Sequence, residues 1–257
     1  MRKNWLASAM IFFILVASEK IYAADLKELK LMTSLSIAPY VIKDENRGIA
    51  IDIITEALAL KGYKTSFEFV SNKRSQMELN AKRIDGAFNI PPGAITDIFI
   101  SDPVVEFQNV VVCLEKRNLK IENIKDLNDK NIFAFQDATK FLGQEFKKIV
   151  ENNPKYNETV NQEAQVYQLY LNRVDVIVLE RRIFLYFLSH LGNRIDTSAK
   201  YVIHPLFPIS PRPVYFIDEK VRNDFNDGLK KLKNNGRYDE VINNYIKGYG
   251  GKKDSSN

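Results

Sequence analysis

The chain has 257 residues, of which 37 are basic and 32 acidic, giving a net charge of +5. Basic and acidic side chains alternate as on a solvated surface, so this small excess does not indicate a nucleic-acid partner. The one Cys, Cys113, excludes an internal disulfide, and the two His have no Cys or second carboxylate at metal-ligand spacing. We therefore predict no metal and no cofactor.

Residues 1–23 have the pattern of a secretory signal peptide. Arg2 and Lys3 precede an uncharged apolar run, and small residues follow at Ala23 and Ala24. The run is shorter than the roughly 20 residues that span a bilayer, so we predict cleavage after Ala23. The protein is then periplasmic, and its net charge falls to +3 because three basic residues and one acidic residue are lost.

The remaining chain alternates strands and helices. Apolar periodicity and turn residues predict strands over 29–34, 65–70 and 85–89, and helices over 49–61 and 73–82. A long apolar strand over 108–114 is the first candidate crossing between two lobes.

After a charged bridge the pattern restarts. We predict a strand over 131–135, helices over 137–152 and 163–172, a strand over 175–179 and a helix over 181–191. Residues 201–204 are the second candidate crossing, followed by a proline-rich path that must be irregular or at a sheet edge. A strand over 214–217 and helices over 220–235 and 238–247 complete the domain, and the tail 248–257 is disordered by composition.

Two stretches of the chain repeat one local pattern. In 81–89 and 171–180 an amphipathic run ends at an Arg, an Asp makes a turn, and an apolar strand closes on a polar residue, Asn89 or Glu180. Ligands in open α/β sheets bind beyond the carboxyl ends of strands, so Asn89 and Glu180 are candidate ligand contacts in two similar lobes. The alternative is that helix–turn–strand units recur in any α/β protein.

A set of short motifs, in this order, resembles the family 3 extracellular solute-binding proteins, the periplasmic receptors of polar amino-acid ABC transporters. The motifs are Ala38-Pro39-Tyr40, Gly48-Ile49-Ala50-Ile51-Asp52, Arg83-Ile84-Asp85, Ser101-Asp102-Pro103, the segment 125–130, Arg173-Val174-Asp175 with Glu180, and Asn234-Asn235-Gly236 through Tyr245. The resemblance implies an α/β, two-lobed periplasmic-binding-protein type II-like fold with two crossing strands. Lobe one is then residues 24–110 and 205–247, and lobe two is residues 111–204.

The resemblance also implies a function. A small polar solute is trapped when the lobes close, and a monomeric receptor delivers it to an inner-membrane ABC permease. Enzymes on the same fold, dehydratase-like, and ligand-sensing modules of membrane kinases are the alternatives. We expect no enzyme activity, although a Glu180 with a raised pKa could act as a general acid.

The sequence departs from the family where ligand is bound. The Arg that grips the α-carboxylate is replaced by Ala94, and the usual stacking aromatic by Ile37, which leaves Tyr40 as the nearest aromatic. Arg74, at a predicted helix start, is a candidate substitute for the missing Arg, although an Arg in a first helical turn is more often only solvated.

Lobe two supplies the remaining candidates. In the family, an acidic residue at the position of Glu180 pairs with the ligand's amino group, and the turn Gln136-Asp137-Ala138-Thr139 binds its carboxylate through free amides. Ordinary helix capping by Asp137 or Thr139 is an equal alternative for the turn, and a surface pair with Arg181 or Arg182 is the alternative for Glu180. We expect Glu180 to be solvated in an open cleft, so that Glu180→Ala abolishes binding without affecting the fold.

Overall fold

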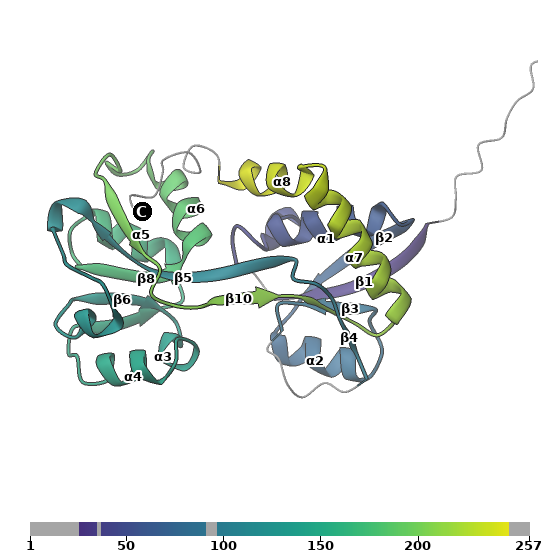
Figure 1. The fold of residues 1–257 in the computed structure, drawn as a ribbon, viewed down its shortest axis with the longest axis horizontal. Helices are drawn as coiled ribbons and strands as arrows, with labels where there is room; N and C mark the ends of the chain where they lie inside the picture. The colour runs from purple at the N-terminus through teal and green to yellow at the C-terminus, as the bar shows by residue number, and fades with distance from the viewer. Residues whose placement is uncertain (1–25, 35–36, 91–96, 247–257) are drawn as a thin grey trace, which may run out of the picture.

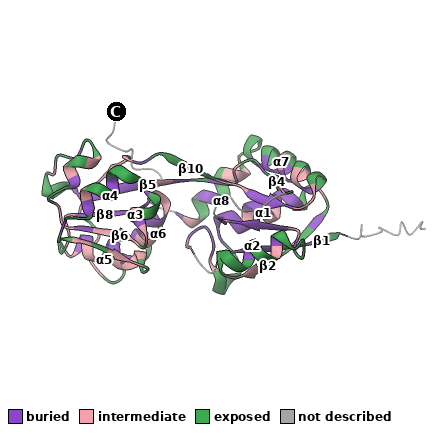
Figure 2. Cartoon of the chain, turned by 90° about the horizontal axis from the view of Figure 1, so that it is seen from below, coloured by how far each residue is buried: buried purple, intermediate pink, exposed green. Residues whose placement is uncertain are grey.

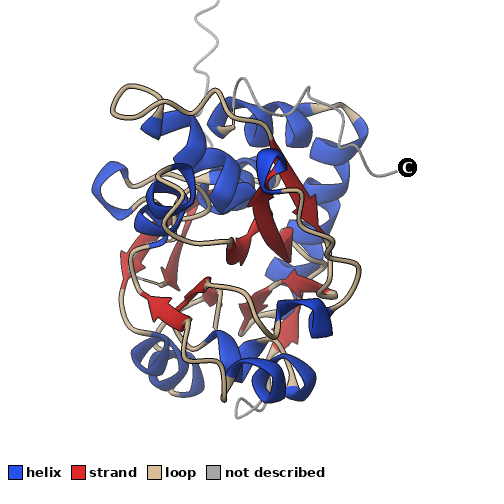
Figure 3. Cartoon of the chain, turned by 90° about the vertical axis from the view of Figure 1, so that its left-hand side faces the viewer, coloured by secondary structure: helices blue, strands red, loops and turns tan. Residues whose placement is uncertain are grey.

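The computed structural model describes residues 26–34, 37–90 and 97–246. The predicted signal peptide, the predicted tail and Ala94 lie outside the described residues. Two α/β lobes lie side by side along the long axis of the molecule (Figure 1). Viewed down that axis, strands occupy the interior and helices the outer layers (Figure 3). Among the described residues, no helix is long and apolar enough to cross a membrane.

Lobe one contains a five-stranded mixed sheet with the order β2-β1-β3-β11-β4. Its strands are β1 (Lys27–Thr33), β2 (Tyr63–Phe69), β3 (Gly86–Phe88), β4 (Phe99–Ile100) and β11 (Val214–Phe216). Its helices are α1 (Ile49–Ala59), α2 (Asn72–Asn80), α7 (Glu219–Asn234) and α8 (Arg237–Tyr245), with the 3-10 turn η1 (Lys43–Glu45). β1 runs parallel to β2 and β3, whereas β11 is antiparallel to β3 and β4.

Strand alternation explains how the helices cover this sheet. On β1, Leu29 and Leu31 pack into the core that contains α1 and α7, whereas Met32 packs with Leu79 of α2. α1 and α7 accordingly lie over one face and α2 over the other (Figure 1). The buried residues follow the strands and the inner sides of the helices in both lobes (Figure 2).

Lobe two contains the second sheet, with the order β10-β5-β8-β6-β7, and β9 also pairs with β5. Its strands are β5 (Val105–Leu114), β6 (Ile132–Phe135), β7 (Tyr156–Thr159), β8 (Val176–Glu180), β9 (Tyr201–His204) and β10 (Ile209–Arg212). Its helices are α3 (Ala138–Phe141), α4 (Gln144–Val150), α5 (Gln162–Tyr170) and α6 (Arg181–Leu191), with the 3-10 turns η2 (Glu115–Arg117) and η3 (Ile124–Leu127). On β8, Val176 and Val178 face the core with α3 and α4, and Ile177 and Leu179 face the core with α5 and α6.

An antiparallel ribbon of two strands joins the lobes. The first half of β5, Val105 to Gln108, pairs only with β10, and its second half pairs with β8 and β9 inside lobe two. The return crossing is therefore β10, and the prediction that residues 201–204 form it is wrong. Because β10 is an edge strand, it tolerates Pro211, which has no N–H to donate.

Lobe two differs from the sequence prediction in two further places. The single helix predicted over 137–152 is two helices, because Gly143 adopts φ 91° between α3 and α4. The strand β7, which pairs in parallel with β6, was not expected at all. It follows Pro154 and is short and polar, so it has no apolar periodicity to reveal it.

The repeated sequence pattern corresponds to a repeated structure. Lys82 and Asn172 both adopt positive φ, 53° and 57°, and each is the second residue after its helix, α2 or α5. The Asp that follows then accepts a bond from the backbone N–H of the neighbouring strand, Asp85 from Lys30 at 2.7 Å and Asp175 from Asn131 at 2.8 Å. Each Asp thus fixes the start of the strand that leads to Asn89 or Glu180.

Candidate functional site

A cleft of about 620 Å³ lies between the lobes on one face of the ribbon. Lobe one contributes Ile37, Asn72 and Asn89, and lobe two contributes, among others, Gln136 and Glu180. Asn89 and Glu180, which close equivalent strands, therefore line the same cleft, the position where open α/β sheets bind ligands.

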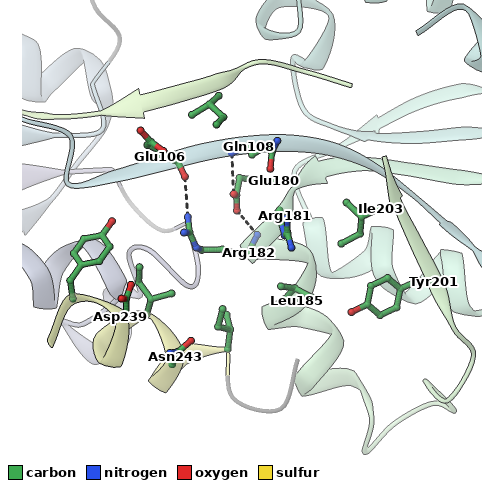
Figure 4. Close-up of a pocket in the computed structure, with 14 residues that line it drawn as sticks. Glu106, Gln108, Glu180, Arg181, Arg182, Leu185, Tyr201, Ile203, Asp239 and Asn243 are labelled. Atoms are coloured by element: carbon green, nitrogen blue, oxygen red, sulfur yellow. Dashed lines mark hydrogen bonds between the residues drawn. The ribbon is translucent and has the colours of Figure 1, made fainter. Parts of the chain in front are cut away.

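The ribbon separates this cleft from a second cavity. On β5, Phe107 and Asn109 line the cleft, whereas Glu106 and Gln108 line a groove of about 550 Å³ between α6 and α8 (Figure 4). Side chains alternate across a strand, which puts neighbouring residues on opposite faces. Glu180 stands at the boundary and lines both cavities.

Glu180 is engaged by the protein itself. It is only 3% exposed, and its Oε2 accepts bonds from the backbone N–H groups of Arg182 at 2.7 Å and Ile183 at 3.1 Å, which makes it the N-cap of α6. Its Oε1 accepts a third bond from the N–H of Gln108 at 3.3 Å (Figure 4). The expectation of a solvated carboxylate is therefore wrong, because the strand ends where the helix begins and the side chain folds back onto that helix.

Burial and neighbouring charges shift the pKa values of the groups around Glu180. Burial raises the pKa of Glu180, while the charge of Arg182 and the backbone bonds oppose that rise. Burial, with Glu180 nearby, raises the pKa of the fully buried Tyr40. Arg182 donates to the Glu106 carbonyl at 3.0 Å and to the Tyr40 hydroxyl at 3.5 Å, so this partly exposed side chain belongs to the network.

The lobe-two turn is also occupied by the protein. Glu158 of β7 accepts bonds from the backbone N–H of Asp137 at 2.7 Å and from the N–H and hydroxyl of Thr139 at 3.3 and 3.4 Å. The Tyr156 hydroxyl donates to the same carboxylate at 2.6 Å. The amides that the resemblance offers to a ligand carboxylate therefore already hold a carboxylate of this chain, and Gln136 is the member of the turn that lines the cleft.

The other sequence candidates are dispersed. Asn89 has φ 58° and donates through Nδ2 to the Ser34 hydroxyl at 3.2 Å. Arg74 is exposed on α2, two residues beyond Asn72, and is not among the residues that line the cleft. Tyr40 is not a lining residue either, but its ring stacks on that of Phe107, with centroids 4.4 Å apart.

Sequence reasoning missed two features of the cleft. Arg212 of β10 lines it, and its guanidinium carbon lies 4.6 Å from the centroid of the Phe107 ring. Aromatic side chains form much of the lobe-two wall, with Phe135 and Phe141 at a centroid distance of 6.4 Å. The signal for Arg212 was its place between two prolines, which indicates an edge strand with alternating faces.

No part of the described chain offers a metal site of three or more His, Cys, Asp or Glu. His204 lies 3.5 Å from the Cys113 sulfur, but burial raises the pKa of the thiol to about 11 and lowers the pKa of the imidazole. Both groups are therefore neutral near pH 7, which is the wrong state for a thiolate nucleophile.

The fold and the cleft agree with comparisons to known proteins. The model of the family described as bacterial extracellular solute-binding proteins, family 3, matches residues 29–248. A comparison with curated proteins gives no match.

Solved structures with the same fold cover most of the chain. The substrate-binding domain 2 of Lactococcus lactis GlnP, in an open conformation, is 17% identical with a TM-score of 0.62, over 86% of this chain and 95% of that one. An ancestral amino-acid-binding protein, a precursor of cyclohexadienyl dehydratase, is 20% identical with a TM-score of 0.60, over 86% and 95%. The substrate-binding protein of an amino-acid ABC transporter is 20% identical with a TM-score of 0.56, over 86% and 99%.

Proposed function

Since the chain belongs to the bacterial extracellular solute-binding proteins of family 3, we propose that it is a periplasmic receptor that captures a small polar solute by lobe closure. The observation that carries this proposal is a cleft lined by both lobes and placed against the only ribbon that joins their sheets in the described chain. Bending of that ribbon changes the width of the cleft, which is the hinge mechanism of two-lobed binding proteins.

The proposed partner is an inner-membrane ABC permease, and the proposed oligomeric state is a monomer. The family, together with the role of one structural neighbour as the substrate-binding protein of an amino-acid ABC transporter, supports the permease partner. Permease and ATPase genes beside the gene for this chain would support it further. The predicted signal peptide supports a periplasmic location.

The proposed ligand contacts are the residues predicted from the sequence, which differ in their structural support. Asn89, Gln136 and Glu180 line the cleft, and so does Ile37, which stands where the resemblance implies a stacking aromatic. Arg74, Asp137 and Thr139 would need lobe closure to bring them to a ligand, and Tyr40 would act through the Phe107 ring.

A thermal-shift screen over amino acids, polyamines, sugars and organic acids tests the proposal. A ligand at 100 times its dissociation constant adds about 2.7 kcal/mol to stability, which a melting curve resolves. For each hit, small-angle X-ray scattering should give a smaller radius of gyration with ligand than without. A screen in which no solute raises the melting temperature or compacts the protein would refute a receptor function.

A dehydratase-like enzyme is the second candidate. It is favoured by one observation, a buried glutamic acid with a raised pKa in the cleft wall, which is the form of a general acid. Incubation of each hit with the protein, followed by mass spectrometry, separates the two functions. A receptor returns the ligand unchanged, whereas loss of water or of carbon dioxide from the hit establishes catalysis.

A further inference from the structure

Strand pairing places Arg212 over the inner wall of the cleft. β10 runs antiparallel to β5, with Ser210 opposite Phe107 and Arg212 opposite Val105. Arg212 and Phe107 are therefore diagonal neighbours on one face of the ribbon, within reach of a long side chain. The guanidinium carbon lies 4.6 Å from the Phe107 ring centroid, so the planar group is held against the ring.

The charge of Arg212 is poorly compensated. Its Nε is buried and has no hydrogen-bond partner, and no carboxylate of the described residues forms an ion pair with it. Glu180 acts on it only at long range, since the Glu180 oxygens are bonded to three backbone N–H groups. Arg212 is only partly exposed and its Nε is buried, so water solvates the cation incompletely, and an anion bound at the cleft side of the guanidinium would supply the missing partner.

The rest of the cleft does not suit a free amino acid. The lobe-two amides are filled by Glu158, and Glu180, the acidic residue available for an ammonium group, is 3% exposed. Apolar side chains form most of the remaining wall: Ile37, Phe107, Phe135, Phe141, Ile183, Phe207 and Ile209. These surfaces favour an apolar body on the ligand.

We propose that the cleft binds a small carboxylate with an apolar body and no ammonium group, and that Arg212 on the ribbon is its anion-binding residue. This inference rests on the proposed receptor function and specifies its ligand class. Arg212, on the ribbon, supplies the positive charge for the ligand carboxylate that Ala94, in lobe one, cannot supply.

The first test compares ligands that differ only in charge. Isothermal titration calorimetry is carried out with 3-phenylpropanoate, 3-phenylpropanamide and L-phenylalanine, and with 4-methylpentanoate and 4-methylpentanamide. Each acid should bind about 10- to 100-fold more tightly than its amide, which is the factor expected for a charge-assisted contact. L-Phenylalanine should bind more weakly than 3-phenylpropanoate, because its ammonium group has no free carboxylate.

The second test compares Arg212→Gln with Arg222→Gln. Arg222 is a matched control, since its guanidinium carbon lies 5.8 Å from the Phe99 ring in lobe one and it is not a cleft residue. Arg212→Gln should remove the preference for acid over amide while the protein still melts cooperatively, and Arg222→Gln should keep it. Arg212→Lys should retain part of the preference, because it keeps the charge and loses the fork.

The outcomes separate this inference from the receptor function. Equal binding of acid and amide, or an acid preference that survives in Arg212→Gln, overturns the role of Arg212. Compaction by an amino acid or a sugar with no binding of the carboxylates overturns the ligand class and leaves the receptor function standing. Failure of every solute in both panels to bind overturns both.

Discussion

Replacement of Glu180 by Ala should destabilise the protein even without ligand. The carboxylate accepts bonds from the N–H groups of Gln108, Arg182 and Ile183, and it is 3% exposed. Ala leaves all three donors without this acceptor, and water can reach them only by entering a buried site. A buried unsatisfied donor costs about 1–3 kcal/mol, and loss of an N-cap alone costs about 0.5–2 kcal/mol.

These terms do not add fully, because Ala also removes a carboxylate whose burial is itself unfavourable. We expect a net loss of about 2–4 kcal/mol, within the range of buried-network mutations. For a chain of this size, each kcal/mol corresponds to roughly 2–4 °C, so the melting temperature should fall by about 4–16 °C.

Asp218 provides the control. It caps α7 through the N–H groups of Lys220 and Val221, at 2.7 and 3.1 Å, and its side chain is 47% exposed. Water can replace this cap, so Asp218→Ala should cost about 1 kcal/mol. Urea unfolding followed by circular dichroism measures both variants, and a Glu180→Ala loss no larger than that of Asp218→Ala would refute the structural role given to the buried carboxylate.

Four further outcomes are expected. The raised pKa of Glu180 means that the folded protein binds this proton more tightly than the unfolded chain, so the contribution of Glu180 to stability should fall as the pH rises above 4.5. Urea titrations between pH 4.5 and 8 should therefore show a weaker pH dependence of stability in Glu180→Gln than in the unsubstituted protein. The same pH dependence in both proteins would contradict the raised pKa. Cys113, buried with a pKa of about 11, should react with a thiol reagent at pH 8 far more slowly in the folded than in the urea-unfolded protein, and equal rates would place it at the surface. Glu158→Ala removes four hydrogen bonds in lobe two and should cost about 2–4 kcal/mol in urea, whereas Tyr156→Phe, which removes one, should cost about 1 kcal/mol. Because the sequence predicts Ala94 at the position of the family's Arg fork, we expect standard free α-amino acids to bind weakly by calorimetry, and submicromolar affinity for several of them would show that another group supplies the contact.

The sequence predicted the α/β architecture because helix, strand and turn patterns depend on residues that are close together in the chain. The helix expected over 49–61 is observed as Ile49–Ala59, and the strand expected over 108–114 is observed as the second half of β5. Asp85 and Asp175 identified two equivalent strand starts, because each follows a residue with positive φ and accepts a bond from the backbone N–H of the adjacent segment. The family and its two-lobed fold followed from the order of such motifs.

Contacts between distant segments were not predictable in the same way. Whether Glu180 faces solvent depends on Gln108, 72 residues earlier, and whether the 137–139 amides are free depends on Glu158 in a strand without apolar periodicity. The position of Arg212 against Phe107 depends on the register between β10 and β5. Sequence patterns give the face on which a residue lies, but not the residue that lies opposite.

The outer edge of the ribbon is closed by the first turn of α6. On the side away from β10, the Glu106 carbonyl accepts a bond from the Arg182 guanidinium and the Gln108 N–H donates to Glu180. An unpaired strand edge is a template for pairing with other chains, and these two side chains block it with bonds of their own. The same two bonds attach the ribbon to α6, so any twist of the ribbon between Glu106 and Gln108 either turns that helix or breaks them. In the lobe closure that we propose, the helix would thereby limit the directions in which the two lobes move.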